Sequence, residues 1–348
     1  MTSVDLTAKQ LMKRWQLPYE RINIHRMRKR DLMRGFHIAR NIDDFRNYTH
    51  ILYWGDFQNN PMYGYSDFCT REVNWNYSPN TPVAKTLWRE LFLSLPERLE
   101  GTVSTASVGN CFIGCSSFKN DKITRSAFES FCLHSKLILP REDYSRRELE
   151  YLGGSAKLPN CLSGLDCAFL YKPNLSHVTI KRPYFAYCFQ RSQVSFSNTQ
   201  RTALEKALDL PGRYTPWTEP GLWRVRGLKK ALNIINGAEL VITDIYHVCV
   251  NALNIGKPVV CLMRSTDSMD NTLSDRKKLA LFEAVNGKKW LIKLGKNEEL
   301  SDHIESIVQL ANIARAENAG LKTVLEQVKI RRQRMLHSLQ EFFGINSH

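Results

Sequence analysis

Residues 239–263 read ELVITDIYHVCVNALNIGKPVVCLM, and this stretch decides the predicted fold. The apolar run at 239–243 predicts a buried strand, and the segment from His247 to Leu253 predicts a short helix that ends at Gly256. A second buried strand is predicted at 258–263. A strand, a helix and a further strand in this order are typical of a βαβ unit, so we expect a parallel sheet.

The turn between the first strand and the helix is the predicted functional site. Either Thr243 or Asp244 can cap the helix, and His247 then lies in its first turn. Unpaired backbone N–H groups and the positive end of the helix dipole favour an anion at this position. The same field disfavours protonation of the imidazole unless an anion binds nearby. We expect His247 to transfer protons, and the alternative is a polar residue that only closes the turn.

More α/β signals lie on both sides of this stretch. A linker is predicted at 172–181, a strand at 184–189 and a helix at 222–235 that Gly237 ends. Apolar residues from Leu321 to Phe342 follow the i, i+3, i+4, i+7 spacing of a long helix. The second half of the chain is therefore predicted to be one α/β unit followed by helices.

The first strand predicted in the first half of the chain is HILYW at 50–54. Turn-forming residues follow it up to Pro61. Further strands are predicted by short apolar runs, namely 101–104, 110–114, 136–140 and the run that begins at Asp166. Ser145 and Glu148 have the spacing of a capping box, so Arg141 and Asp143 should lie on a strand-to-helix turn. Such turns are where α/β proteins place ligands.

Composition indicates a soluble globular protein that favours anionic partners. Of the 348 residues, 49 are Lys or Arg and 34 are Asp or Glu, which leaves a net charge of +15. Basic clusters at 26–34 and 329–334 are either solvated helix faces or a contact with a membrane surface or a lipid-linked acceptor. Because no helix-turn-helix and no aromatic–basic RNA motif stands out, we expect no nucleic-acid partner.

The nine cysteines are an odd number and most of them lie inside apolar runs, a pattern typical of reduced, buried thiols. Cys111 and Cys115 have no second pair at zinc-finger spacing, so no metal site is expected. The first residues contain no apolar stretch of signal-peptide length, and nowhere do 18 apolar residues run together. We therefore expect a cytoplasmic protein, at most peripheral at the inner membrane surface.

VITDIYHVCVNALNIGKPVVCL at 241–262 resembles a segment of the polysaccharide pyruvyl transferases, in which a strand and a turn ending in His precede a small-residue helix and Gly-Lys-Pro. Weaker likenesses follow the family's order along the chain. They are LYWGDFQNN (52–60), LPREDYSRRELEYLGG (139–154), SGLDCAFL (163–170) and the Lys-containing helix at 273–285. Together these segments cover residues 50–290 loosely.

The resemblance implies an α/β fold with two Rossmann-like domains, parallel sheets and a GT-B-like arrangement, with the active site in the inter-domain cleft. We accordingly expect four regions. They are an N-terminal helical arm (1–45), an N-terminal Rossmann-like domain (46–175), a C-terminal Rossmann-like domain (176–300) and C-terminal helices (301–348).

The reaction that the resemblance implies transfers the enolpyruvyl carbon of phosphoenolpyruvate onto two hydroxyls of a sugar or lipid-linked oligosaccharide, giving a cyclic ketal without a metal or other cofactor. It needs an acid and base, for which His247 is the candidate, and cations for phosphate and carboxylate. The candidate substrate-binding residues are Arg141, Lys277, Arg191, Asp56, Asn59, Thr243 and Asp244, with Asp166 as a further group for sugar hydroxyls.

Several of these residues have structural alternatives. Arg141 can instead pair with Asp143 or Glu148, Lys277 and Lys278 can face solvent, and the side chains of Asp56 and Asn59 can simply form turns.

Ile245 is a departure from the family pattern. The family has Arg two residues before the histidine, whereas this chain has Ile245, which cannot supply a bidentate contact to carboxylate or phosphate. Either Arg141, Arg191 or Lys277 takes over that role, or the donor differs. The alternative function is a GT-B-type glycosyltransferase with a nucleotide-sugar donor in polysaccharide biosynthesis.

Overall fold

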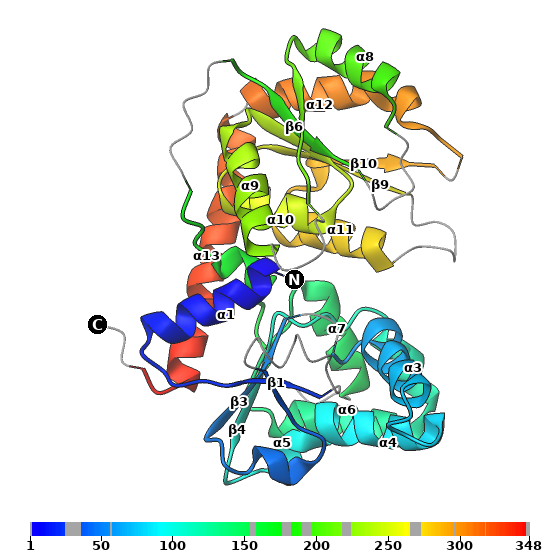
Figure 1. Cartoon of the computed structure of the whole chain (residues 1–348), viewed down its shortest axis with the longest axis vertical. Helices are drawn as coiled ribbons and strands as arrows, with labels where there is room; N and C mark the ends of the chain where they lie inside the picture. The colour runs from blue at the N-terminus through cyan, green and yellow to red at the C-terminus, as the bar shows by residue number, and fades with distance from the viewer. Residues whose placement is uncertain are drawn as a thin grey trace. The chain divides into compact units, whose positions relative to one another are not determined.

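The computed structural model describes residues 2–24, 36–55, 58–153, 158–175, 182–189, 196–217, 224–264, 273–295, 297–316 and 318–345. The chain forms two compact units, each with a parallel sheet (Figure 1). The three-strand unit comprises residues 8–167 and 333–348, and the five-strand unit comprises residues 1–7 and 168–332. Residues 1–7 therefore belong to the unit formed by the second half of the chain, and residues 333–348 belong to the unit formed by the first half. The division between the units falls at Cys167 rather than at the linker predicted at 172–181.

The three-strand unit has the strand order β3-β4-β5, all parallel. Its strands are β3 (His50–Trp54), β4 (Ser104–Val108) and β5 (Leu137–Leu139). Its helices are α3 (Asp67–Asn74), α4 (Thr81–Arg89), α5 (Leu95–Arg98), α6 (Lys122–His134) and α7 (Asp143–Leu152), with π-helical turns η2 (Pro61–Ser66) and η3 (Glu90–Ser94) and the 3-10 helices η1 (Ile42–Phe45) and η4 (Cys115–Asn120). The predicted strand at 50–54 is confirmed, and every second residue in it is buried, as expected of a strand with one covered face.

Two of the predicted strands in this half are wrong, and the one predicted at 101–104 is misplaced, because residues 101 and 102 form a turn and the strand begins only at Ser104. Residues 110–114 turn instead of extending, since Gly109 and Gly114 on either side both have positive φ. Asp166 leads into the 3-10 helix η5 (Cys167–Leu170) and not into a strand. The amino-terminal region is likewise not wholly helical, because β1 (Arg21–Asn23) and β2 (Phe36–Ile38) pair as parallel strands after α1 (Thr2–Arg14).

The five-strand unit confirms the predicted βαβ order. Its parallel strands are β6 (Phe185–Cys188), β7 (Gly212–Tyr214), β8 (Leu240–Thr243), β9 (Val259–Arg264) and β10 (Leu291–Leu294), in the spatial order β10-β9-β8-β6-β7. Its helices are α8 (Asn198–Leu208), α9 (Arg224–Gly237), α10 (Tyr246–Asn254), α11 (Leu273–Ala284), α12 (Ile304–Ala316) and α13 (Asn318–Phe342), which continues past the unit's last residue, with the short 3-10 helices η6 (Lys288–Trp290) and η7 (Leu300–His303).

Helices cover both faces of this sheet (Figure 1). Residues of α8 and α12 share a buried apolar cluster with one face, and α9, α10 and α11 lie on the other. Strand β8 is consequently buried at every position. This is why its sequence is a continuous apolar run and not an alternating one.

The cysteines are buried and free of disulfides, which confirms the prediction of reduced, buried thiols. Burial raises the pKa of both Cys161 and Cys188 to about 12. Thiols with such pKa values carry little thiolate, so they are poor nucleophiles. Within the described part of the chain, no helix combines the length and the apolar character needed to cross a lipid bilayer.

Asp121 provides a test of the three-strand unit. As the N-cap of α6 it accepts hydrogen bonds from the Thr124 N–H (3.1 Å) and hydroxyl (2.8 Å), and it pairs with Lys85. Burial raises its pKa, but the bonds from Lys85 and Thr124 outweigh this and lower the pKa to about 2. The depressed pKa means that the carboxylate stabilises the fold above its unfolded-state pKa and loses this contribution as the pH falls through about 2.

We therefore expect Asp121→Ala to lower the free energy of unfolding by about 1 kcal/mol near neutral pH, with a deficit that shrinks on acidification below about pH 4. Urea unfolding monitored by circular dichroism between neutral and acidic pH measures this. Asp121→Asn keeps an acceptor for the Thr124 N–H and should lose less at neutral pH. A deficit independent of pH would show that the carboxylate charge contributes nothing.

Candidate functional site

The strand order of the five-strand unit reverses beside β6. The chain passes from β6 to β7 on one side and then to β8 on the other. Connections that leave the carboxyl ends of β6 and β8 therefore go to opposite faces of the sheet, through α8 and α10. In open parallel sheets such a switch point is the usual position of a ligand-binding crevice.

Thr243 joins the two strands at this point. Its fully buried hydroxyl donates to the Cys188 carbonyl of β6 (2.6 Å) and accepts from the Ile245 N–H (3.1 Å). The prediction that Thr243 or Asp244 caps the helix is wrong, because the N-cap is Ile245 and no side chain caps α10. The Ile245 side chain is itself buried, so an apolar group occupies the position at which the pyruvyl transferases have Arg.

His247 is the second residue of α10 and is half-buried. Its ring meets that of Tyr246 edge to face at 5.1 Å, and its carbonyl accepts from the Asn251 amide (2.8 Å). The predicted place of His247 in the first turn of a helix after a buried strand is confirmed. The helix dipole is directed at this turn, which suits an anionic group.

Lys278 anchors the same turn from α11. Its fully buried ammonium donates to the carbonyls of Asp244 (3.1 Å) and Leu262 (3.0 Å) and pairs with the buried carboxylate of Asp275 (2.7 Å). The sequence pattern favours Lys277 as the functional cation and does not distinguish Lys278 from a solvated residue. The sequence does contain a signal that Lys278 is buried. Leu281 and Phe282, at i+3 and i+4, are apolar and place Lys278 on the buried face of the helix.

Lys277 lies on the adjoining face of α11. Its ammonium is 5.6 Å from the centre of the Tyr246 ring, close enough for a cation–π contact with the first residue of α10. Four of the predicted site residues thus lie in one unit, around the turn that precedes α10, namely Thr243, Asp244, His247 and Lys277. Asp244 is fully buried.

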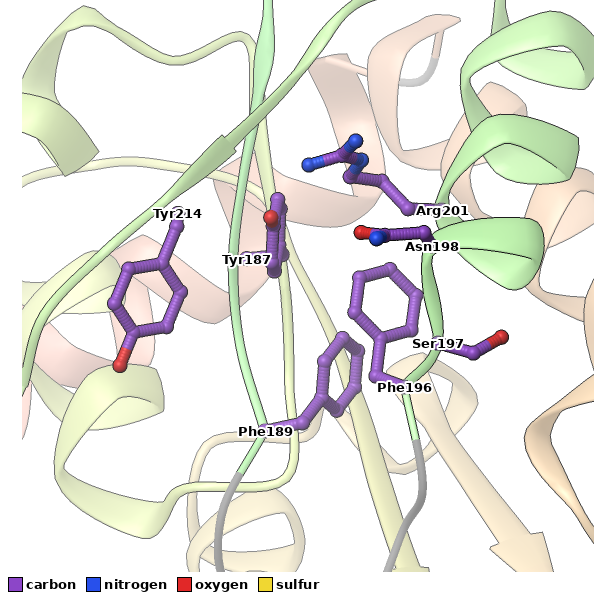
Figure 2. Close-up of a pocket in the computed structure, with 7 residues that line it drawn as sticks. All are labelled: Tyr187, Phe189, Phe196, Ser197, Asn198, Arg201 and Tyr214. Carbon is purple, nitrogen blue, oxygen red and sulfur yellow. The ribbon is translucent and has the colours of Figure 1, made fainter.

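An aromatic pocket of about 230 Å³ lies at the carboxyl ends of β6 and β7 (Figure 2). It is lined by Tyr187, Phe189, Phe196, Ser197, Asn198, Arg201 and Tyr214. Rings lie close together here, since Phe196 is 4.9 Å from Tyr187 and 4.6 Å from Phe189 between ring centres. Figure 2 shows Arg201 and Asn198 extending from α8 towards Tyr187, whereas the Ser197 side chain points away.

Arg201 is the cation of this pocket. A hydrogen bond with Tyr187 raises the pKa of the guanidinium, and Glu205 lies 3.8 Å away on the same helix. None of the predicted site residues lines this pocket. The signal was the spacing of Phe185, Tyr187 and Phe189, which places three rings on one face of β6.

The three-strand unit holds the other predicted residues. Arg141 follows β5 and is buried, and its guanidinium lies 3.3 Å from Glu142 and 3.6 Å from Asp166. Its charge is therefore balanced inside the unit, by residues other than the expected partners Asp143 and Glu148. Burial raises the pKa of the Glu142 carboxyl, which the Arg141 charge partly offsets.

The predicted capping box at Ser145 and Glu148 is also wrong. Helix α7 begins after Glu142, and the Ser145 hydroxyl donates to Glu142 and accepts from the Phe112 N–H (2.7 Å). The Glu148 carboxylate accepts from the Ser116 N–H (2.6 Å) instead of from its own helix. Both side chains thus hold the segment after β4 against α7.

Asn59 is fully buried, and its amide donates to the Phe92 carbonyl (2.9 Å) in η3. This contact fastens the loop after β3 to η3, whereas the turn-forming alternative describes a bond to the loop's own backbone. Asp56 and Arg191 lie outside the described residues. That the residues of the two units line one cleft stays a prediction.

Comparison with known proteins bears on the fold. No family model matches the chain, and no curated protein matches it. Among solved structures, a Listeria monocytogenes protein described as a UDP-N-acetylglucosamine 2-epimerase is 14% identical with a TM-score of 0.50, over 97% of this chain and 87% of that chain. A UDP co-structure of S. aureus MnaA is 11% identical with a TM-score of 0.40, over 90% and 84% of the two chains.

Arabidopsis thaliana UGT89C1 complexed with UDP-L-rhamnose is 11% identical with a TM-score of 0.44, over 81% of this chain and 76% of that chain. At such identities the first likeness shows the fold alone. It confirms the predicted fold class, which is α/β with two Rossmann-like units and parallel sheets of the GT-B-like type.

Proposed function

We propose that this chain is an enzyme that acts on a nucleotide-activated sugar and holds the nucleotide at the carboxyl edge of the five-strand unit. The observation that carries the proposal is the pairing of two features at the end of β6. A helix N-terminus without a side-chain cap begins after β8, and an aromatic pocket with a guanidinium opens beside β6. Phosphate suits the first feature, and a planar base suits the second.

The size of the pocket supports this division of roles. Pockets that enclose a drug-sized ligand usually measure about 300–1,000 Å³, so a volume of about 230 Å³ suits a single ring and not a whole nucleotide sugar. The base would stack on Tyr187 or Phe196, and Arg201 would supply a charged hydrogen bond. The diphosphate would then lie towards α10, where the helix dipole and Lys277 favour negative charge.

The chemistry that follows is transfer of the sugar to a hydroxyl acceptor. A bond forms between the acceptor oxygen and the anomeric carbon as the bond from that carbon to the phosphate oxygen breaks. The diphosphate leaves with the electron pair and is stabilised at the α10 N-terminus. His247 takes the proton from the acceptor hydroxyl, which explains its place in the first turn of that helix.

Pyruvyl transfer from phosphoenolpyruvate stays as the second candidate. It shares the anion site at α10 and the role of His247 as acid and base. Pyruvyl transfer gives the aromatic pocket no ligand to bind, and the buried Ile245 supplies no guanidinium for the phosphoenolpyruvate donor. These two points favour the nucleotide.

Isothermal titration calorimetry with UDP, GDP and phosphoenolpyruvate as separate titrants tests the proposal. We expect at least one nucleoside diphosphate to bind, and Arg201→Met to weaken that binding by roughly ten- to hundredfold, since a charged hydrogen bond contributes roughly 1.5–3 kcal/mol. Lys206→Met removes an exposed charge from the same helix outside the pocket and should bind as the wild type does. Binding of phosphoenolpyruvate without any nucleotide would overturn the proposal in favour of ketal formation.

A further inference from the structure

A group of exposed aliphatic side chains lies on the three-strand unit, outside the residues assigned to the site above. Met62, Val83 and Ile123 are 56%, 46% and 67% exposed, and they belong to η2, α4 and α6 respectively. Single exposed aliphatic side chains are normal on a protein surface. Several of them on neighbouring elements form an apolar patch, and such patches mark interaction sites.

Contacts between these elements bring the three side chains onto one surface. Tyr65 of η2 meets Trp88 of α4 at 5.2 Å and Phe118 of η4 at 5.5 Å between ring centres. Lys85 of α4 pairs with Asp121, which is the N-cap of α6. The start of α6 is thus held beside α4 (Figure 1), and η2 packs against α4 and η4. The exposed side chains of η2, α4 and the start of α6 therefore share one surface.

The charged side chains of the same elements make this surface positive. The acidic residues of α4, η4 and α6 with its N-cap are Asp121, which is paired as described, and Glu129, which pairs with Arg125 (3.1 Å). Three further cations of these elements have no acidic partner among the described residues. They are Arg89, Lys119 and Lys122. We refer to these three cations and the three exposed aliphatic side chains as the Ile123 patch.

We propose that the Ile123 patch binds an anionic lipid surface. Aliphatic side chains enter the boundary between the headgroups and the acyl chains, and cations without an acidic partner attract anionic headgroups. The long stems of Lys and Arg let their charges stay at the headgroups while the aliphatic groups insert. A nucleic-acid site would instead combine cations with stacking rings, and the exposed apolar groups here are Met, Val and Ile.

This surface is distinct from the two basic clusters that the sequence pattern singles out. The cluster at 26–34 lies outside the described residues. In the cluster at 329–334, Lys329 already pairs with Glu326 (3.7 Å) on the same helix. The inference goes beyond the proposed function and does not rest on it, because binding to a lipid surface requires no nucleotide.

Vesicle flotation of the full chain tests the inference. One set of vesicles is pure phosphatidylcholine, and the other contains equal parts of phosphatidylcholine and phosphatidylglycerol. We expect binding to the phosphatidylglycerol vesicles and a much lower partition coefficient for the neutral ones. The double variant Lys119→Gln/Lys122→Gln should lower the partition coefficient by more than about tenfold, since each cation near an anionic surface contributes roughly fivefold.

Ile123→Ser tests the apolar part of the patch. It should lower the partition coefficient by roughly fivefold, and this loss should persist at high ionic strength, at which the attraction between charges is screened. Two matched controls change the five-strand unit instead. Lys206→Gln/Lys230→Gln removes the same charge from exposed positions, and Val225→Ser replaces an aliphatic side chain that is 54% exposed. Neither control should change binding by more than about twofold, and thermal unfolding shows whether each variant is folded.

Three results would overturn the inference. They are no binding of the wild type to phosphatidylglycerol vesicles, equal losses for the two double-lysine variants, and full binding by Ile123→Ser. A dimer in sedimentation velocity that Ile123→Ser dissociates, without any vesicle binding, would assign the patch to a second copy of the chain. Failure of every nucleoside diphosphate to bind would remove the proposed function and leave this inference standing, since the vesicle assay contains no nucleotide.

Discussion

His247→Ala will lower kcat by roughly 10²- to 10⁴-fold, the range that a positioned proton-transfer group contributes. His247 lies at the N-terminus of α10, where the Val248 and Cys249 N–H groups hold the helix through bonds to the Ile245 carbonyl. The variant should therefore fold like the wild type. Turnover of a nucleotide sugar with an oligosaccharide acceptor, measured at saturating donor, checks the effect.

His337→Ala is the matched control for this loss. His337 lies on α13 with its side chain 63% exposed, so its removal should leave kcat unchanged. Nucleotide binding by the His247→Ala variant should also stay within a few fold of the wild type, because the proton transfer and not the ground-state complex is affected. Full activity of the His247→Ala protein would remove this residue from the mechanism.

Lys278→Met is expected to be the most destabilising of the substitutions considered, by about 3–5 kcal/mol, which is typical when one partner of a buried ion pair is removed. It leaves the buried Asp275 carboxylate without its ammonium partner. It also removes the donor to the carbonyls of Asp244 and Leu262, so the turn before α10 loses its anchor. Urea denaturation followed by circular dichroism measures the loss.

Two variants separate the ion pair from general effects of removing a lysine. Lys277→Met takes a half-buried cation from the neighbouring position and should cost less than about 1 kcal/mol. Adding Asp275→Asn to Lys278→Met removes the unpaired charge and should recover part of the stability. If Lys278→Met unfolds at the same urea concentration as the wild type, the buried pair does not stabilise the unit.

The predicted strands and helices of the five-strand unit follow from local patterns. The run around β8 and β9 is apolar throughout because helices cover both faces of the sheet, and the glycine at 256 ends α10 with a positive φ. Such signals depend on neighbouring residues alone. They place His247 correctly at the start of a helix.

Local patterns failed where the partner of a residue lies far away in the sequence. Ser145 and Glu148 have the spacing of a capping box, yet each bonds to the segment after β4, 33 and 32 residues away. The apolar run after Asp166 has the composition of a strand but folds as a 3-10 helix. A short apolar run does not by itself distinguish these outcomes.

The sequence by itself determined the α/β class, the strands β6, β8 and β9 of the second half and the position of His247, because hydrophobic periodicity and glycine stops act within a few residues. Only the tertiary structure decided which charged side chains are buried and paired inside the protein. Arg141 is balanced by Glu142 and Asp166, and Lys278 rather than Lys277 is buried against the turn at Thr243 and Asp244. The reason is that burial and ion pairing depend on which strands and helices become neighbours, and hydrogen-bond partners 16 and 34 residues away from Lys278 leave no periodic mark in the sequence.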